Sequence, residues 1–189
     1  VIHSDKELLS DVDSVLTAHR LSSYDTPKQA YQVISDRIYT DTKRISAILD
    51  IVSDKSVKQP LIFYINNSVK DAISTALLEN GISYQEVSGN TKASDFIDDD
   101  LSPVLVQYKS GGSSIEFLHS NVSIFAQNQP SIGMLNQAKG RNVRRGMTET
   151  VRQYTLHTDI LFDTQILERQ AKLIEIADKD FEKNFLEQL

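Results

Sequence analysis

From residue 60 onward, short apolar runs alternate with stretches of helical period, and this alternation constrains the fold more than any other feature. The runs are LIFYIN (61–66), ISYQEV (82–87), VLVQY (104–108), VSIFA (122–126) and TVRQYTLH (150–157). Such short, largely apolar runs are typical of strands that are buried on both faces of a parallel sheet. Strands that alternate with helices predict an α/β fold, in which a parallel sheet carries helices on both faces.

Helices are also expected before and after this region. Apolar residues recur at helical spacing through the first third of the chain, where Pro27 follows Thr26 as at a helix start, and again through the final segment. We therefore expect three parts: an N-terminal helical extension (1–57), a lobe that contains the sheet (58–158) and a C-terminal helical extension (159–189).

Within the lobe, three helices are expected between the strands. Ser68 is expected to cap the first helix at its start, and Gly81 is expected to end it. A short helix is expected around Ile115–Leu118, and a longer one that contains Gln137 precedes the last strand.

The overall charge limits the kinds of partner. The 189 residues include 20 basic and 26 acidic side chains, for a formal net charge of −6. This balance argues against binding of nucleic acid over the whole surface, because long-range attraction to phosphate needs a positive field. The chain has no cysteine and its histidines are scattered, so no thiolate chemistry, catalytic triad or metal site is predicted.

No segment has the character of a membrane anchor or a signal peptide. The longest apolar runs, at 60–65 and 103–106, are too short to cross a bilayer, and the chain does not begin with a basic segment followed by an apolar one. We expect a cytoplasmic protein. Because the chain opens on Val1, we also expect it to be part of a longer protein.

Two short segments carry the candidate chemistry, and the first is KSGGSS (109–114), the glycine segment. It directly follows a predicted buried strand, and ligands of parallel sheets gather at the carboxyl ends of the strands. Its backbone N–H groups could bind a phosphate, although a simple turn is the alternative. The pattern GxxxxGK[ST] does not occur, so the sequence does not encode a complete ATP site.

The second is QAKGRNVRRG (137–146), the basic segment. It places Lys139, Arg141, Arg144 and Arg145 within seven residues of an acidic chain. If it is helical, Gln137, Arg141 and Arg144 share one face, and Gly140 lets a ligand approach closely. Two guanidinium groups on one face suit a polyphosphate, whereas a solvated basic helix end is the alternative interpretation.

The order of these segments resembles the second RecA-like lobe of superfamily-two helicases, with the Swi/Snf-like DNA translocases of phage or bacterial type the most similar. The basic segment matches the motif VI pattern Q-A-x-G-R-x-x-R-x-G. LIFYINN (61–67) resembles motif IV, YQEVSG (84–89) the strand and Ser-Gly after it, and VLVQYKSGGSSIEF (104–117) motif V. VRQYTLHTDILFDTQILE (151–168) is similar to the strand and helix that close this lobe. The resemblance covers roughly residues 43–175.

The resemblance implies an ATP-dependent DNA helicase or translocase whose two lobes hold ATP and Mg²⁺ between them. The first lobe would bind most of the nucleotide and the metal. From this chain, Arg141 and Arg144 would be the catalytic arginines, with Arg144 as the arginine finger, and Gln137 and Gly140 would support the phosphates. The nucleic-acid backbone, of duplex DNA by expectation, would be contacted at these positions: Ser88, Gly89, Ser110, Gly111, Gly112 and Ser113.

Motif V departs from the family pattern at two positions. Ser114 and Glu116 stand where the family has glycine and asparagine, and a carboxylate close to a phosphate track is unfavourable unless it is paired. A degenerate RecA-like module that binds nucleic acid or a protein without ATPase activity is therefore the alternative function. The chain alone is expected to be inactive.

Overall fold

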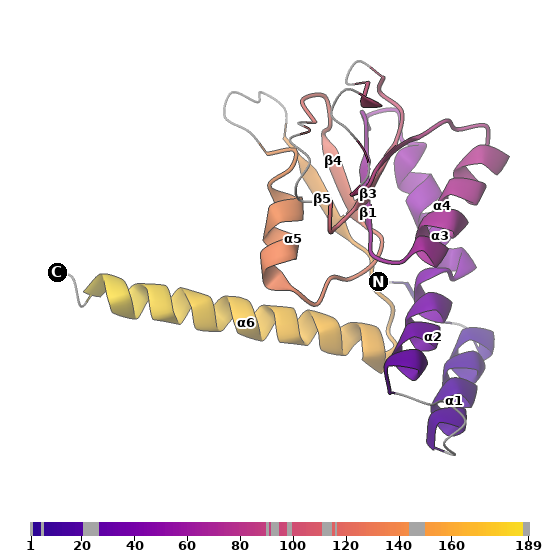
Figure 1. Cartoon of the computed structure of the whole chain (residues 1–189), viewed down its shortest axis with the longest axis vertical. Helices are drawn as coiled ribbons and strands as arrows, with labels where there is room; N and C mark the ends of the chain where they lie inside the picture. Colours follow the sequence, from indigo (N-terminus) through magenta and orange to yellow (C-terminus); the bar gives the residue numbers. More distant parts are fainter. Residues whose placement is uncertain are drawn as a thin grey trace.

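The computed structural model contains one mixed α/β unit built on a five-stranded sheet (Figure 1). It describes the following residues, to which all structural statements refer: 2–4, 6–20, 27–89, 91, 95–97, 100–110, 115, 117–143 and 150–186.

The five strands are parallel and have the order β2-β3-β1-β4-β5. They are β1 (Leu61–Tyr64), β2 (Gln85–Val87), β3 (Val104–Gln107), β4 (Val122–Phe125) and β5 (Arg152–Thr155). Every expected strand is present and each lies within its predicted run, so the predicted parallel α/β sheet is confirmed.

Helices cover both faces of the sheet, as expected. They are α1 (Lys6–Arg20), α2 (Pro27–Tyr39), α3 (Thr42–Val52), α4 (Asn67–Glu79), α5 (Ile132–Lys139) and α6 (Leu161–Leu186). In Figure 1, α3 and α4 lie on one side of the sheet and α5 on the other, while α1 packs against α2 and α6 extends away from the body. The first position of α2 is Pro27, as the sequence predicts.

Each face of the sheet has its own hydrophobic core. Along β1, Ile62 and Tyr64 belong to the cluster shared with α2, α3 and α4, whereas Leu61 and Phe63 belong to the cluster shared with α5. The alternation follows from the strand period, which turns successive side chains to opposite faces. Because both faces are covered, the three central strands β1, β3 and β4 are apolar at nearly every position, whereas the edge strands β2 and β5 are more polar and less buried.

Two local predictions are wrong. Ile115 and Phe117 are not helical; both are buried in the α5-side core, and Phe117 packs edge to face with Phe96. Ser68 is not a cap either, because α4 begins at Asn67 and the Ser68 hydroxyl donates to the Asp36 carboxylate on α2, at 2.7 Å. In both cases tertiary packing overrides a local preference.

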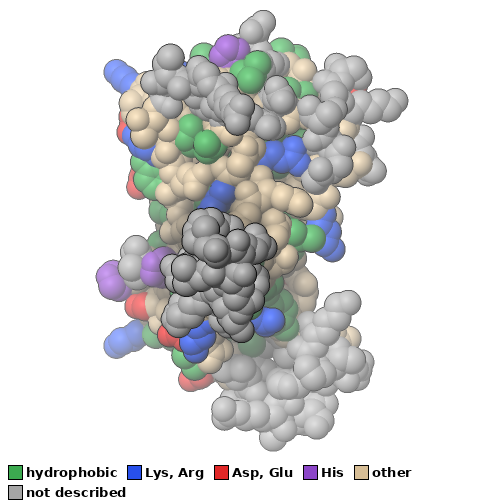
Figure 2. Space-filling view, turned by 90° about the vertical axis from the view of Figure 1, so that its left-hand side faces the viewer, with side chains coloured by type: hydrophobic (Ala, Val, Ile, Leu, Met, Phe, Trp, Pro, Cys, Tyr) green, Lys and Arg blue, Asp and Glu red, His purple; other side chains and the backbone are tan. Residues whose placement is uncertain are grey.

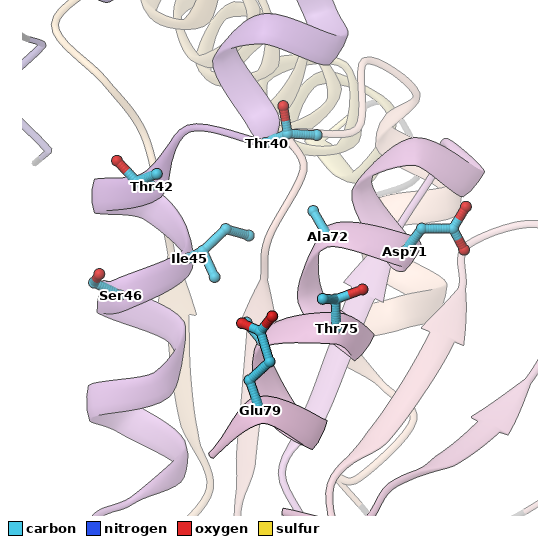
Figure 3. A pocket seen from close by; sticks show the side chains of 9 residues that line it. Thr40, Thr42, Ile45, Ser46, Asp71, Ala72, Thr75 and Glu79 are labelled. Carbon is cyan, nitrogen blue, oxygen red and sulfur yellow. The ribbon is translucent and has the colours of Figure 1, made fainter.

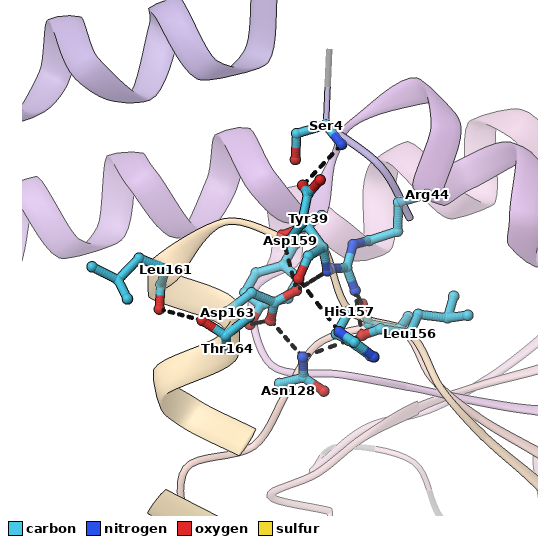
Figure 4. Close-up of polar contacts among 12 residues, drawn as sticks. Ser4, Tyr39, Arg44, Asn128, Leu156, His157, Asp159, Leu161, Asp163 and Thr164 are labelled. Atoms are coloured by element: carbon cyan, nitrogen blue, oxygen red, sulfur yellow. Dashed lines mark hydrogen bonds and ion pairs between the residues drawn. The ribbon is translucent and has the colours of Figure 1, made fainter. Parts of the chain in front are cut away.

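The start of α6 is fixed by a fully buried carboxylate, that of Asp163. It accepts hydrogen bonds from Arg44 Nη2 at 2.5 Å, Tyr39 O–H at 2.9 Å, Asn128 Nδ2 at 2.5 Å and the Thr158 backbone N–H at 2.6 Å. These groups come from α3, α2 and the segments that follow β4 and β5, and they converge on the carboxylate in Figure 4. Burial, reinforced by the Asp163 carboxylate, raises the pKa of Tyr39 far above its ordinary value, so its hydroxyl remains a donor.

Arg44 extends this network to the backbone of the sheet. Its side chain is fully buried, and Nη1 donates to the carbonyl oxygens of Ala126 at 3.0 Å and Leu156 at 2.8 Å. These carbonyls directly follow β4 and β5, beyond the end of each strand. One guanidinium therefore joins α3, two strand ends and α6.

We predict that Arg44→Ala lowers the free energy of unfolding by about 3–5 kcal/mol, because it leaves a buried carboxylate without its counter-charge. Urea denaturation of the chain measures this change. Arg169→Ala, an exposed arginine on α6, is the matched control and should shift the same quantity by less than about 0.5 kcal/mol. Equal effects of the two substitutions would show that the buried pair contributes nothing beyond a surface charge.

Candidate functional site

The basic segment begins in a helix and leaves it at Gly140. The helix α5 ends at Lys139, Gly140 donates its N–H to Asn136 O, and Arg141 donates its N–H to Ala138 O at 3.1 Å. Gln137 is exposed on the helix, whereas Arg141 lies in the turn after it. The helix thus does not extend through Arg141, so the condition under which Gln137, Arg141 and Arg144 would share one helical face is not met, and Arg144, Arg145 and Gly146 lie outside the described residues.

Gly140 is not required by the backbone of this lobe. Its φ is −82°, which any residue adopts, and a Cβ there would meet Asn136 O at 3.5 Å and Gln137 O at 3.7 Å, which are ordinary contacts. A function for this glycine would thus depend on a ligand or partner, as the sequence prediction supposed, and that prediction stays open.

Asn142 turns the chain inward directly after Arg141. Its side chain is fully buried; its Oδ1 accepts from Ser123 Oγ at 3.1 Å and its Nδ2 donates to Ser120 Oγ at 3.1 Å. Ser123 lies in β4, where every residue is buried, and Ser120 lies just before that strand. This inserted amide explains why the helix does not continue through the basic segment.

These contacts place the basic segment toward the amino-terminal edge of the sheet. Besides the contacts of Asn142 at the start of β4, Gln153 on β5 donates from Nε2 to Lys139 O at 3.0 Å. The backbone of the segment, at Lys139 and Asn142, thus lies beside the amino-terminal half of β4 and β5, whereas parallel sheets usually bind ligands at the carboxyl ends of their strands.

Arg141 joins the basic segment to the glycine segment. Its Nη2 donates to the backbone carbonyl of Ser110 at 3.1 Å, across 31 residues of sequence. Ser110 is buried and is itself held to the end of β3, because its N–H donates to Gln107 O at 2.9 Å. The fold therefore brings the two predicted segments into direct contact.

The structure gives less detail on the other residues that were predicted to bind nucleic acid. Gly111, Gly112 and Ser113 lie outside the described residues, as do Ser114 and Glu116 of the altered motif V. Ser88 and Gly89 follow β2, the edge strand, and the Ser88 N–H donates to Thr91 Oγ1 at 2.9 Å. Gly89 is exposed, and no atom lies within 4 Å of a Cβ built there. The contacts described for Ser88 are local and do not reach Arg141.

Side chains fill the crevice at the carboxyl edge of the sheet. The chain leaves β1 toward β2 and leaves β4 toward β5, so the strand order reverses between β1 and β4. There, Gln127 Oε1 accepts from the backbone N–H groups of Ile65 at 2.9 Å and Asn66 at 3.0 Å, and its Nε2 donates to Ser35 Oγ on α2. Asn66 Nδ2 also donates to Asp36 Oδ1 at 3.1 Å. The backbone N–H groups of Ile65 and Asn66, which directly precede α4, therefore already have a side-chain partner.

A groove of about 510 Å³ runs between α3 and α4 and is separate from both segments (Figure 3). Ile45 and Ala72 face its interior, and the Glu79 carboxylate lies within it, whereas Asp71 points away. Among the described residues that line it there is no lysine or arginine, so the groove lacks the charge that a phosphate ligand needs.

The distribution of basic side chains on the surface fits a function that is confined to one site and not spread over the whole surface. On the face toward which α6 points, lysine and arginine side chains occur at separate places, some of them beside aspartate or glutamate (Figure 2). Within the described part of the chain, no group of three or more His, Asp or Glu side chains could hold a metal ion. No helix in that part is long and apolar enough to cross a membrane.

Sequence reasoning missed Asn142, Ser120 and Ser123. A signal was present, because Ser123 interrupts an otherwise apolar run that had to be buried on both faces. A buried hydroxyl needs a partner, so a polar side chain was required somewhere opposite this strand. Nothing in the sequence identified that partner as the residue after Arg141.

Solved structures of similar fold exist for this chain. The chain is similar to the crystal structure of the C-terminal part of the Fun30 ATPase domain, with a TM-score of 0.61 and 23% sequence identity over 70% of this chain. The chain spans 46% of the length of that structure. No family model and no curated protein matches the sequence. The fold is therefore α/β and RecA-like, of the kind found in the C-terminal part of an ATPase domain.

Proposed function

We propose that the chain is the second motor lobe of a DNA-dependent ATPase of the helicase or translocase type. In this proposal the nucleotide lies between this lobe and a first RecA-like lobe of the same protein. Arg141 and Arg144 act on its phosphates, and the glycine segment contacts the backbone of duplex DNA. Hydrolysis of ATP is coupled to movement along the DNA.

The contact between Arg141 and Ser110 carries the proposal. A coupled motor needs its phosphate-sensing and DNA-sensing groups to be in physical contact, because energetic coupling travels through contiguous contacts. The hydrogen bond of 3.1 Å joins the segment predicted to bind phosphate to the segment predicted to bind DNA. If the basic segment were only a solvated helix end, its arginine side chains would be expected to extend into water and not to donate to a buried backbone carbonyl.

The filled crevice supports a shared nucleotide site. Gln127 and α2 occupy the place where an open α/β sheet usually binds its own ligand. Arg141 lies in the turn after α5 and is partly exposed. In this proposal a triphosphate would be presented to Arg141 and Arg144 from outside, by the other lobe.

The chemistry assigned to the arginines is electrostatic. Phosphoryl transfer develops charge on the equatorial oxygens, and a guanidinium with forked donors stabilises that charge. Mg²⁺ would supply further neutralisation in the complete site. The proposal leaves the binding of this ion to the first lobe.

Glu116 and Ser114 favour a second candidate function, that of a RecA-like module that binds nucleic acid or a partner without hydrolysis. A carboxylate beside the glycine segment opposes contact with a phosphate backbone. The experiments below distinguish the two functions.

We predict that Arg144→Ala in the full-length protein lowers DNA-stimulated ATP turnover by roughly 10³-fold or more, the usual effect of removing an arginine finger. DNA affinity should change by no more than a few-fold. Arg144→Lys should restore little, because lysine keeps the charge but not the planar fork. Steady-state ATPase assays with and without duplex DNA, and fluorescence anisotropy of labelled DNA, measure the two quantities.

Gly112→Val is the matched variant on the DNA side. It should mainly weaken stimulation by DNA, because a β-branched side chain keeps the backbone away from phosphate. If Arg144→Ala instead abolished DNA binding and left basal turnover intact, the basic segment would be a DNA-binding patch. If the full-length protein had no ATPase activity under any condition, the binding module would be the correct function.

We predict that the 189-residue chain alone binds duplex DNA weakly and with little sequence preference. With two or three phosphate contacts, log K should fall with log salt at a slope of only about −2 to −3. Anisotropy titrations over a series of salt concentrations measure this slope, and Glu116→Gln should strengthen binding because it removes a carboxylate. Nanomolar, sequence-specific binding would identify a dedicated DNA reader instead.

A further inference from the structure

The side chain of Asn142 is an unusual element of the basic segment, because it is polar and yet fully buried in the α5-side core. Burying an amide is unfavourable unless its hydrogen bonds are replaced. Here both ends are satisfied, by Ser123 Oγ at 3.1 Å and by Ser120 Oγ at 3.1 Å. The Ser120 hydroxyl in turn donates to Val122 O at 3.2 Å, so the amide is continuous with the backbone of β4.

This buried amide lies next to the guanidinium that holds the glycine segment. The turn that carries Arg141 is fixed on its N-terminal side by the bond from Arg141 N–H to Ala138 O. On its C-terminal side, Asn142 anchors it to β4. With the backbone held at both ends, the long Arg141 side chain starts from a defined position and reaches Ser110 O.

We infer that Asn142 is a positioning residue of the motor site, which holds Arg141 in place for the glycine segment and for the phosphates. The inference rests on the proposed function for the phosphate contact, but not for the contact with Ser110. Asn142 touches neither ligand; it acts through Arg141 and through the backbone that continues toward Arg144. An apolar residue at 142 would fill the same space but would leave two buried hydroxyls without this partner.

A merely structural role predicts a different pattern. If Asn142 only stabilised the fold, Asn142→Ala would lower stability without a specific effect on the glycine segment. A matched control exists at the same edge of the sheet. Asn121 is also buried and has two hydrogen bonds, from Lys58 N–H at 2.8 Å and to Ser56 O at 2.9 Å, but these lead to the α3–β1 connection.

The first test uses the 189-residue chain and needs no ligand. Hydrogen exchange measured on a peptide that covers residues 104–118 should speed up in Arg141→Ala and in Asn142→Ala. The double variant should exchange no faster than Arg141→Ala alone, because residues that act through one contact are not additive. Asn121→Ala should leave this peptide unchanged. Additive effects of the two substitutions, or an equal effect of Asn121→Ala, would overturn the inference.

The second test uses the full-length protein. Asn142→Ala should lower kcat for DNA-stimulated ATP hydrolysis by roughly 10- to 100-fold, the scale of a small misplacement of a catalytic group. The KM for ATP should change by no more than a few-fold. Asn142→Asp should retain most of the turnover, because a buried carboxyl that remains protonated can accept from one serine and donate to the other. If Asn142→Ala does not fold, Ser123→Ala removes one of the two bonds and should show the same pattern with a smaller effect.

The outcomes separate this inference from the proposed function. If Arg144→Ala retains full turnover, the motor proposal fails, whatever the exchange experiment gives. If Arg144→Ala is inactive while Asn142→Ala and Asn121→Ala have equal turnover, only the positioning role is wrong. Rescue by Asn142→Asp together with non-additive exchange supports it.

Discussion

The buried ion pair between Arg44 and Asp163 is the interaction on which the arrangement of this lobe depends. An isolated buried pair adds little stability, because desolvation of two charges offsets their attraction. Here the two charges do more than neutralise each other. Asp163 accepts from a backbone N–H, a hydroxyl and an amide, and Arg44 donates to the carbonyls that follow β4 and β5. Apolar side chains of the same volume would leave all of these groups without partners.

The network also gives the two edges of the sheet different properties. At the carboxyl edge, Arg44, Asp163 and Gln127 connect α2, α3, α6 and the strand ends through buried polar contacts. Interiors of this kind are rigid and have little space for a ligand. Arg141, by contrast, is partly exposed in the turn after α5, beside the amino-terminal part of β4, and its side chain reaches Ser110, which follows β3. In the proposed function, the rigid carboxyl edge would serve as the frame for a surface that meets another lobe.

The sequence predicted the sheet well because strand burial leaves a direct trace in composition. All five predicted runs became parallel strands, and the three central ones, β1, β3 and β4, are apolar because helices cover them on both faces. The end of α5 was not predictable from period alone, because the buried side chain of Asn142, which follows the turn at Gly140 and Arg141, has partners distant in sequence. Likewise, the sequence pattern indicates that Arg44 is a solvent-exposed residue on an amphipathic helix. Its partner is 119 residues away, and no local pattern connects the two.

The two arginines assigned to the phosphates, Arg141 and Arg144, need not have the same part in the proposed site. Arg141 Nη2 donates to Ser110 O, so its guanidinium also serves the contact with the glycine segment. A guanidinium has its N–H donors in a planar fork, which lets one group face two partners. In the proposed site, a change in the bound nucleotide or in the bound DNA would then act on the same group, the guanidinium of Arg141. The amide of Asn142, the next residue, sets the position of this guanidinium. Lysine has the charge but lacks a planar group that can face two partners at once. In the proposed site, this geometry would favour an arginine at position 141, directly before the buried asparagine that anchors the turn.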